Sequence, residues 1–284
     1  MFGATGQLAL AMVDATAARG LGLTTLSRSN VDLTDTAAIR DAIAHAPDGS
    51  IILNAAAYTA VDKAETEREL AVQVNTEAPA TMAKAAAERG LGFIHVSTDY
   101  VFDGMKASAY AETDTTNPKG VYGQTKLDGE IAVADVHPGA AIVRTSWVYS
   151  PFGANFLKTM LRYGVDRDEL RVVDDQVGAP TSAHDIAEGL LTLIAAGGNH
   201  GVFHLTGSGE ASWADFADAI FEHQASVWGR RPTVTRIPTS EYPTPAARPA
   251  NSRLNCDRFE QVCGYRAPHW RDSMARVLDQ INRG

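Results

Sequence analysis

A tyrosine and a lysine four residues apart are the side chains of this chain that best suit carbonyl chemistry. Tyr122 and Lys126 lie in VYGQTKLDGE, a segment predicted to be helical. A spacing of four places both on one helical face, where the cation lowers the pKa of the phenol from its reference value near 10. Such a phenol can exchange a proton at neutral pH, which suits the reduction of a carbonyl. The alternative is a Tyr–Lys pair on a solvated helix, so the surroundings must decide.

Polar residues at the end of a predicted strand provide those surroundings. The strand GFIHVSTDYVF (92–102) contains Ser97, Thr98 and Asp99. In parallel α/β sheets, ligand-binding groups lie at the carboxyl ends of the strands. A hydroxyl group there can hydrogen-bond a substrate carbonyl beside Tyr122.

A glycine-containing turn opens the chain. In MFGATGQLAL, Gly3 suits a tight turn and Gly6 lets backbone N–H groups approach a pyrophosphate at a helix N-terminus. Ala9 takes the third position, which governs packing of the helix on the sheet. Only Met1 and Phe2 precede the turn, so we expect a first strand that is apparently truncated to these two residues, or a misassigned start.

The elements that must position these groups alternate between helix and strand. In the first half the pattern predicts helices over 3–20, 35–46, 67–90 and 121–136, and strands over 21–27, 50–58, 92–102 and 140–150. Strands separated by helices indicate right-handed crossovers and a parallel sheet covered on both faces. The sequence therefore predicts an α/β fold of the Rossmann type, a doubly wound parallel sheet.

The second half is less regular. It is predicted to contain helices over 155–164, 184–198 and 213–229, strands within 169–182 and 201–209, and a proline-rich loop over 238–252. We expect residues 1–150 to form a dinucleotide-binding domain and residues 151–284 to form mainly a smaller substrate-binding lobe. Segment 180–197 is expected to pack back onto the first domain.

Composition excludes several classes of protein. The chain has 284 residues, 45% of them hydrophobic, and a net charge of -9, which argues against binding nucleic acid or an anionic membrane. The two cysteines, Cys256 and Cys263, stand outside any metal-ligand spacing, so we expect reduced thiols and no metal. No apolar run approaches the ~18 residues of a membrane span, and no signal-peptide pattern occurs. These features predict a cytoplasmic protein.

Several motifs together resemble one known family. GATGQL, NAAAYTAVDKAE, VNTEAP, STDYVFDG, VYGQTKLDGE, RTSWVY and DDQVGAPT are similar to the extended short-chain dehydrogenase/reductase superfamily and, more narrowly, to the dTDP-4-dehydrorhamnose reductase family. The resemblance covers nearly the whole chain. It implies transfer of a hydride from a reduced nicotinamide to C4 of dTDP-4-dehydro-β-L-rhamnose, which gives dTDP-β-L-rhamnose without a metal.

The resemblance also implies roles for individual residues. Thr98, Tyr122 and Lys126 match the catalytic triad, with Tyr122 as proton donor, Thr98 orienting the carbonyl oxygen and Lys126 holding the nicotinamide ribose. The residues expected to bind the cofactor are Gly3, Gly6, Gln7, Leu8, Arg28, Asp32, Leu33, Ala57, Tyr58, Thr59 and Val96, with Tyr122 and Lys126. Those expected to bind the substrate are Val61, Thr98, Asp99, Trp147, Asn155, Phe156, Arg248 and Ser252. Alternatives are a core role for Trp147 and a solvated Arg248.

The turn after the second predicted strand indicates which cofactor is used. It carries Ser27, Arg28 and Ser29 and no acidic residue that would bind a ribose 2′-hydroxyl. An arginine there suits a 2′-phosphate, so we expect NADPH, with NADH as an alternative.

Two other functions stay open at this point. One is another sugar-nucleotide reductase or epimerase of the same superfamily. The other is a non-catalytic subunit resembling the regulatory subunit of methionine adenosyltransferase, although competent groups at all three triad positions disfavour a pure binding role. We expect a monomer or a homodimer.

Overall fold

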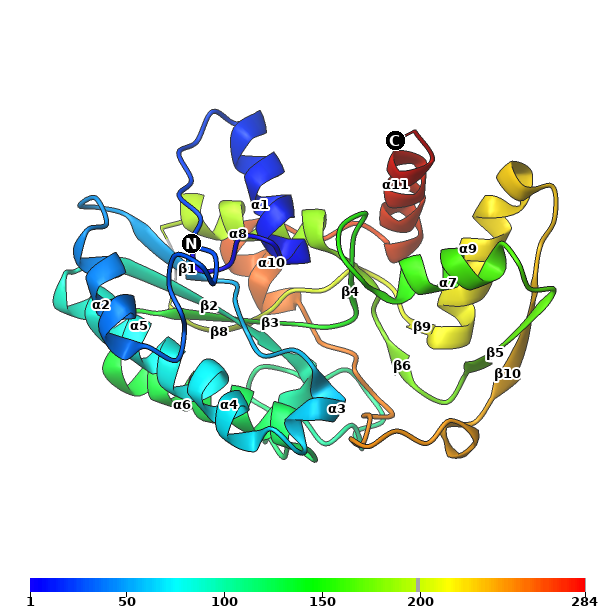
Figure 1. Cartoon of the computed structure of the whole chain (residues 1–284), viewed down its shortest axis with the longest axis horizontal. Helices are drawn as coiled ribbons and strands as arrows, with labels where there is room; N and C mark the ends of the chain where they lie inside the picture. Colours follow the sequence, from blue (N-terminus) through cyan, green and yellow to red (C-terminus); the bar gives the residue numbers. More distant parts are fainter. Residues whose placement is uncertain (198–199, 284) are drawn as a thin grey trace.

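The computed structural model describes residues 1–197 and 200–283. Its main sheet contains four parallel strands in the order β1 (Ile51–Asn54), β2 (Gly92–Thr98), β3 (Ala141–Thr145) and β8 (Gly201–His204). Helices cover both faces of this sheet, with α1 and α8 on one face and α2, α5 and α6 on the other (Figure 1). The predicted α/β fold with a doubly wound parallel sheet is confirmed.

The two residues before the glycine turn lie between two neighbouring segments. Phe2 forms parallel bridges with Leu26 on one side and Asn54 on the other, and both Met1 and Phe2 are buried. The strand predicted over 21–27 is wrong except at Leu26, the one residue of this segment that forms a β-bridge. Its neighbour provides only two residues to pair with, so the ladder cannot extend.

The helices of the first half lie close to their predicted ranges. They are α1 (Gln7–Ala18), α2 (Thr36–Ala44), α3 (Val61–Ala64), α4 (Arg68–Val72), η1 (Gln73–Glu77), α5 (Ala78–Glu88) and α6 (Val121–Val136). The helix predicted over 67–90 is divided by η1, a π-helical turn of the kind that often marks a functional site. A 3-10 turn, η2 (Asp99–Val101), follows β2 directly.

Two glycines let α6 lie unusually close to the segments that end at the cavity. A Cβ atom on Gly123 would stand 2.2 Å from the Tyr100 carbonyl oxygen, and one on Gly129 would stand 2.1 Å from that of Asn75. Any side chain there would push α6 away from both carbonyls. The glycines therefore set the depth at which Tyr122 and Lys126 stand relative to β2.

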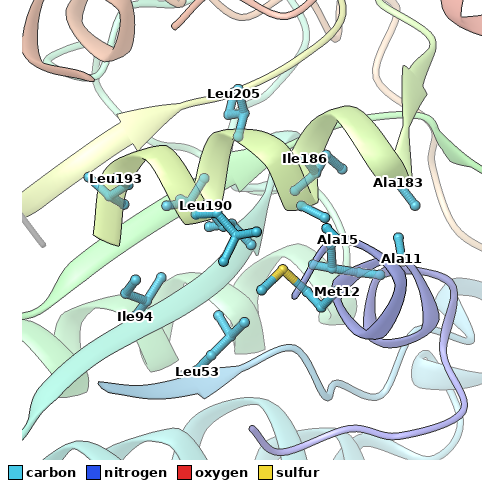
Figure 2. Packing of buried hydrophobic residues seen from close by; sticks show 14 of the residues in the cluster. Ala11, Met12, Ala15, Leu53, Ile94, Ala183, Ile186, Leu190, Leu193 and Leu205 are labelled. Carbon is cyan, nitrogen blue, oxygen red and sulfur yellow. The ribbon is translucent and has the colours of Figure 1, made fainter. Parts of the chain in front are cut away.

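The other face of the sheet is closed by α8 (Ala183–Ala195), which packs against α1. Figure 2 shows Met12 of α1 lying between α8, which carries Leu190, and the strand residues Leu53 and Ile94. Segment 183–195 thus contributes to the same core as the first strands. The predicted end of this helix at Gly198 lies outside the described residues.

The second half adds three two-stranded sheets and its own helices. Its elements are β4 (Val148–Tyr149), α7 (Phe156–Gly164), β5 (Glu169–Val173), β6 (Val177–Gly178), β7 (Thr181–Ser182), β9 (Ala211–Ser212), α9 (Trp213–Trp228), β10 (Thr233–Ile237), η3 (Thr239–Glu241), α10 (Asp257–Cys263) and α11 (Trp270–Arg283). The pairs are β10 with β5, β4 with β7, and β6 with β9. A separate aromatic core, with Phe216, Phe221 and Trp270, joins α7, α9 and α11.

The chain crosses between its halves more than once. After the second half has begun, β8 returns to the main sheet and α10 packs on β8. Among the described helices, none combines the length and the apolar character that a membrane crossing needs.

Candidate active site

A cavity of about 800 Å³ lies at the carboxyl edge of the main sheet, where β1, β2, β3 and the opening turn end. It is lined by every residue predicted to bind the cofactor, by the predicted triad Thr98, Tyr122 and Lys126, and by Val61, Asp99 and Trp147. Four residues predicted to bind the substrate do not line it: Asn155, Phe156, Arg248 and Ser252. The residues that do line it range from Gly3 to Trp147 in the sequence, and the fold brings them together.

The opening turn has the geometry of an anion site. Gly3 adopts φ +105°, a conformation that L side chains rarely take, and passes close to the Ala55 backbone. Gly6 caps α1 with φ -72° and no side-chain hydrogen bond, and nothing lies within 4 Å of where its Cβ would be. The first N–H groups of a twelve-residue helix thus face open cavity, as a phosphate-binding turn requires.

Thr98 and Asp99 form a hydrogen-bonded pair at the end of β2. The Thr98 hydroxyl donates to Asp99 Oδ1 at 3.1 Å and accepts from the Tyr100 N–H at 3.2 Å. Burial raises the pKa of Asp99 to about 6, although hydrogen bonds from Ser252 and Thr98 act in the opposite direction. Asp99 is therefore a buried carboxyl group beside the predicted reacting centre.

Tyr122 stands opposite this pair on the first turn of α6. Burial raises its pKa to about 12, while a hydrogen bond with Thr98 lowers it. The expectation that Lys126 lowers the phenol pKa is wrong for this structure, because burial raises that pKa and Nζ of Lys126 is directed at the Val96 carbonyl. A phenol with a high pKa is fully protonated at neutral pH, which is the state a proton donor needs.

The Lys126 amine is buried and directed toward β2. Its Nζ donates to the Val96 carbonyl at 2.7 Å and lies 3.2 Å from Nε2 of His95. Burial lowers the pKa of Lys126 to about 8, and the charge of Glu130 acts against this shift. Glu130 is itself held by Arg144 of β3, at 2.6 Å.

Buried polar atoms without a partner mark the cavity as a site built for a polar ligand. Among the described residues they are Ser97 Oγ, Asp99 Oδ2, Thr145 Oγ1 and Arg248 Nη1. Three of these residues line the cavity. Because buried polar groups are nearly always paired, hydroxyls at the ends of β2 and β3 fit a bound nicotinamide nucleotide and its substrate.

Trp147 interrupts the strand predicted over 140–150. It has φ +49°, the one positive value among the described non-glycine residues, and separates β3 from β4. Its indole stacks on that of Trp213, with ring centroids 3.5 Å apart, and packs against Gly178. One edge of a stacked aromatic pair therefore faces the cavity.

Asn155 and Phe156 do not line the cavity; both contact other parts of the protein. Asn155 caps α7 by accepting from the Lys158 N–H, and its Nδ2 donates to Gln7 Oε1 at 2.8 Å. Phe156 packs against Trp213 and Phe216. Both residues lie one step behind the cavity wall, where Asn155 supports Gln7 and Phe156 supports the Trp147–Trp213 stack.

Arg248 and Ser252 belong to a segment that we call the strap, residues 238–252, which runs from β10 back to the first half (Figure 1). Arg248 Nη2 donates to Asp62 Oδ2 of α3 at 2.7 Å, and the Ala246 N–H donates to Asp62 Oδ1. Ser252 is buried and hydrogen-bonds Asp99. The alternative of a solvated Arg248 is wrong, since this side chain is mostly buried and paired.

Sequence reasoning missed Asn75, which holds one wall of the cavity. This buried residue lies in the π-helical turn η1, and its Oδ1 accepts from the Tyr58 N–H at 2.8 Å while its Nδ2 donates to Thr125 of α6. It thereby joins the segment after β1 to α6. The motif VNTEAP contained the signal, an asparagine on the helical face that otherwise carries Ala71, Ala78 and Met82.

The described ranges 1–197 and 200–283 contain no cluster of three His, Cys, Asp or Glu residues that could hold a metal ion. The expectation that the reaction needs no metal stays a prediction.

A glycine turn and a Thr–Tyr–Lys set that meet at the carboxyl edge of one parallel sheet define the chain as an extended short-chain dehydrogenase/reductase. Comparison with known proteins narrows this class. A family model described as "RmlD substrate binding domain" matches residues 1–283. The chain is 49% identical to the dTDP-4-dehydrorhamnose reductase of Sinorhizobium fredii, over 97% of this chain and 95% of that one.

Comparison with solved structures points to the same family. The structure of a dTDP-4-dehydrorhamnose reductase from Clostridium acetobutylicum superposes with a TM-score of 0.93 at 37% identity, covering 99% of this chain and 98% of that one. The enzyme of the same name from Bacillus anthracis, solved in complex with NADP, gives 0.92 at 32% identity, covering 98% and 97%. The chain therefore belongs to the dTDP-4-dehydrorhamnose reductase family.

Proposed function

We propose that the chain reduces the C4 carbonyl of dTDP-4-dehydro-β-L-rhamnose to the alcohol of dTDP-β-L-rhamnose with NADPH. One observation carries this proposal: the opening glycine turn and the Thr98–Tyr122–Lys126 set face the same cavity. The names of the relatives support the choice of substrate, and the NADP complex of one of them supports the choice of cofactor.

The chain's own residues would act on the carbonyl oxygen. When bound, NADPH supplies the hydride. Tyr122, protonated because its pKa is high, donates its proton to the oxygen as negative charge develops there. The Thr98 hydroxyl, already hydrogen-bonded to Asp99 and Tyr122, orients that oxygen. Lys126 holds the nicotinamide ribose from the floor of the cavity.

The cofactor would lie along the opening turn and the end of β1. The N–H groups after Gly6 face the pyrophosphate, and Ala57, Tyr58 and Thr59 flank the nucleotide. Arg28 lies at the cavity edge near Asp32, whose pKa is lowered mainly by hydrogen bonds from Thr34. A guanidinium in this position favours the 2′-phosphate of NADPH over the hydroxyl of NADH.

The substrate would occupy the part of the cavity nearer the second half. Val61, Asp99 and Trp147 line this part directly, with Arg248 and Ser252 of the strap behind it. We further infer that residues 1–150 with 180–197 serve mainly the cofactor, and that the remainder of 151–284 serves mainly the substrate. A cytoplasmic location and a monomeric or dimeric state stay predictions.

Turnover tests the proposal directly. The purified chain should oxidise NADPH when dTDP-4-dehydro-β-L-rhamnose is added, and the Tyr122→Phe variant should lose about 10²–10⁴-fold in kcat because the proton donor is gone. Its Tm should change little. Tyr163→Phe is a matched control, since that hydroxyl lies on the surface of α7 and accepts from Arg162.

Each possible failure has a separate meaning. Wild-type kcat in Tyr122→Phe would show that Tyr122 is not the proton donor. A folded wild-type chain that reduces a different 4-keto nucleotide sugar, but not this one, would favour another enzyme of the superfamily.

A further inference from the structure

Lys126 has a buried neighbour that the proposed mechanism does not use. His95 of β2 is completely buried, with Nε2 3.2 Å from Lys126 Nζ and Nδ1 3.1 Å from Asn54 Nδ2. Asn54 and His95 are paired in register between β1 and β2. The three side chains thus form a continuous buried line from β1, across β2, to α6.

The backbone determines which ring nitrogen of His95 carries the proton. The Ala56 N–H donates to Asn54 Oδ1 at 3.1 Å, so the amide turns its NH₂ group toward His95 Nδ1. Nδ1 must then accept, and a neutral imidazole that accepts at Nδ1 carries its proton on Nε2. This tautomer is assigned from the hydrogen bonds, and it directs an N–H donor at Lys126.

That arrangement suits an uncharged lysine better than a charged one. An ammonium group has donors and no lone pair, so it cannot accept from Nε2–H. A neutral amine has a lone pair and can accept from His95 while it still donates to the Val96 carbonyl. All the polar atoms of the line are satisfied only after Lys126 has lost a proton.

We propose that His95, oriented by Asn54, is a positioning residue that stabilises the uncharged amine of Lys126 through an Nε2–H···Nζ hydrogen bond. The inference rests on the proposed function and deepens it. After Tyr122 has given its proton to the product oxygen, a phenolate remains. Lys126 supplies the replacement through water in the cavity, because its Nζ is directed at the Val96 carbonyl and His95. Its N–H bond breaks with the electron pair staying on Nζ, the water relays the proton, the O–H bond of Tyr122 forms, and a solvent proton later restores the ammonium.

The charges around Lys126 act in both directions, because Glu130 favours the ammonium while His95 adds no charge of its own. Burial and the nearby Lys126 charge lower the pKa of His95 well below its ordinary value, so the imidazole stays neutral. The charged side chains of α4, η1 and α5 are exposed. The titratable and charged groups nearer to Lys126 are Tyr122 and Glu130 of α6, His95 of β2, Asp99 and Tyr100 of η2, Glu65 after α3, and Arg144 of β3, which holds Glu130.

The wild-type protein provides the first test. The ¹⁵N spectrum of its histidine rings, without cofactor or substrate, should show His95 as the neutral Nε2–H tautomer throughout the stable pH range. The Nδ1–H tautomer would overturn the proposal, because Nε2 would then be an acceptor for a charged lysine. This measurement requires no variant to fold.

The second test follows the titration of Lys126 itself by NMR of its labelled side chain, identified by its loss in Lys126→Arg. In His95→Phe the ring remains but the donor is gone, so the midpoint should rise by about one pH unit, the size expected for one lost hydrogen bond. In His95→Gln an amide N–H can take the place of Nε2–H, so the midpoint should return toward the wild-type value.

An unchanged or lowered midpoint in His95→Phe would overturn the proposal, and so would equal shifts in both variants. A purely structural role would lower Tm and leave the midpoint in place. None of these readouts needs turnover. An active enzyme with the wrong tautomer would therefore disprove the role of His95 alone, whereas a correct titration in a chain without reductase activity would disprove the proposed function alone.

Discussion

Asp99 carries a carboxyl group that titrates near neutral pH inside the cavity wall. Burial raises its pKa to about 6, and one of its oxygens has no hydrogen-bond partner. In the unfolded chain the same group has a pKa near 3.9. The native state therefore binds more protons between about pH 4 and 6, so the free energy of unfolding falls as pH rises through this window and levels off above it.

Replacing Asp99 with Asn should remove this pH dependence. Two pKa units correspond to a loss of the order of 3 kcal/mol in the wild type between pH 4 and 8, which the variant would not show. Urea unfolding of both chains over this range measures the difference, and all other titrating groups cancel because both chains share them. Parallel curves would contradict the pKa that burial gives this carboxyl group.

The motifs that resemble the reductase family predicted the lining of the cavity better than the contacts behind it. Tyr122, Lys126 and Thr98 were found because each stands in a short motif. The role of Asn155 could not be found in this way, because its partner Gln7 lies 148 positions away. The pKa of Tyr122 was predicted in the wrong direction, because a sequence shows the neighbouring charge but not the burial.

At the scale of elements, the opening turn separates two functions that both require glycine. Gly3 meets a conformational requirement, φ +105°, whereas Gly6 has an ordinary φ and an empty space where its Cβ would be. That space belongs to the cavity. We therefore expect Gly3 to affect the stability of the fold and Gly6 to affect the affinity for the ligand in the cavity.

The two alanine variants should differ accordingly. Gly3→Ala should lower the free energy of unfolding by about 1–2 kcal/mol, the cost of a strained backbone. Gly6→Ala should keep the wild-type Tm but weaken NADPH binding at least about tenfold, because a methyl group would stand where the phosphate approaches the N–H groups. Calorimetry and a fluorescence titration measure the two effects. Equal NADPH affinity in Gly6→Ala would exclude the turn as the phosphate site.

Helices with a clear apolar pattern and recognisable first and last residues were predicted well. Helix α6 begins at Val121 and ends at Val136, as expected from the sequence. The strand over 21–27 failed because a strand needs a neighbour, and Met1 and Phe2 offer only two residues. β10 and α10 were not predicted because they are short. Helix α11 was overlooked, although Trp270, Met274, Val277 and Leu278 follow a helical spacing.

At the scale of the whole molecule, the strap runs from the end of β10 to α3, where it contacts Asp62, and to Asp99 in the cavity wall. Asp62 receives both the Ala246 N–H and one nitrogen of Arg248, while the other terminal nitrogen of Arg248 is buried without a partner. A guanidinium that is fixed by one carboxylate and still has a free donor suits an incoming diphosphate.

Arg248→Gln should raise the KM for the dTDP-sugar about tenfold or more and leave the Kd of NADPH unchanged. Arg253→Gln is the matched control in the adjoining segment, because Arg253 is engaged with Glu210, Asn251 and the Ala107 carbonyl. That change should lower Tm without altering KM. An unchanged KM in Arg248→Gln would remove Arg248 from the diphosphate site.

The hydrogen bonds of Gln7 imply that the two ligands communicate. Its Oε1 accepts from Ser150 and from Asn155, the cap of α7, so the residue that follows the glycine turn is tied to the half that we propose binds the sugar. If binding of one ligand shifts these hydrogen bonds, the affinity for the other ligand changes as well, and thermodynamic linkage makes the change in affinity reciprocal. Calorimetric titration of dTDP with and without NADPH should therefore show synergy, and Asn155→Ala should bring the coupling factor close to one.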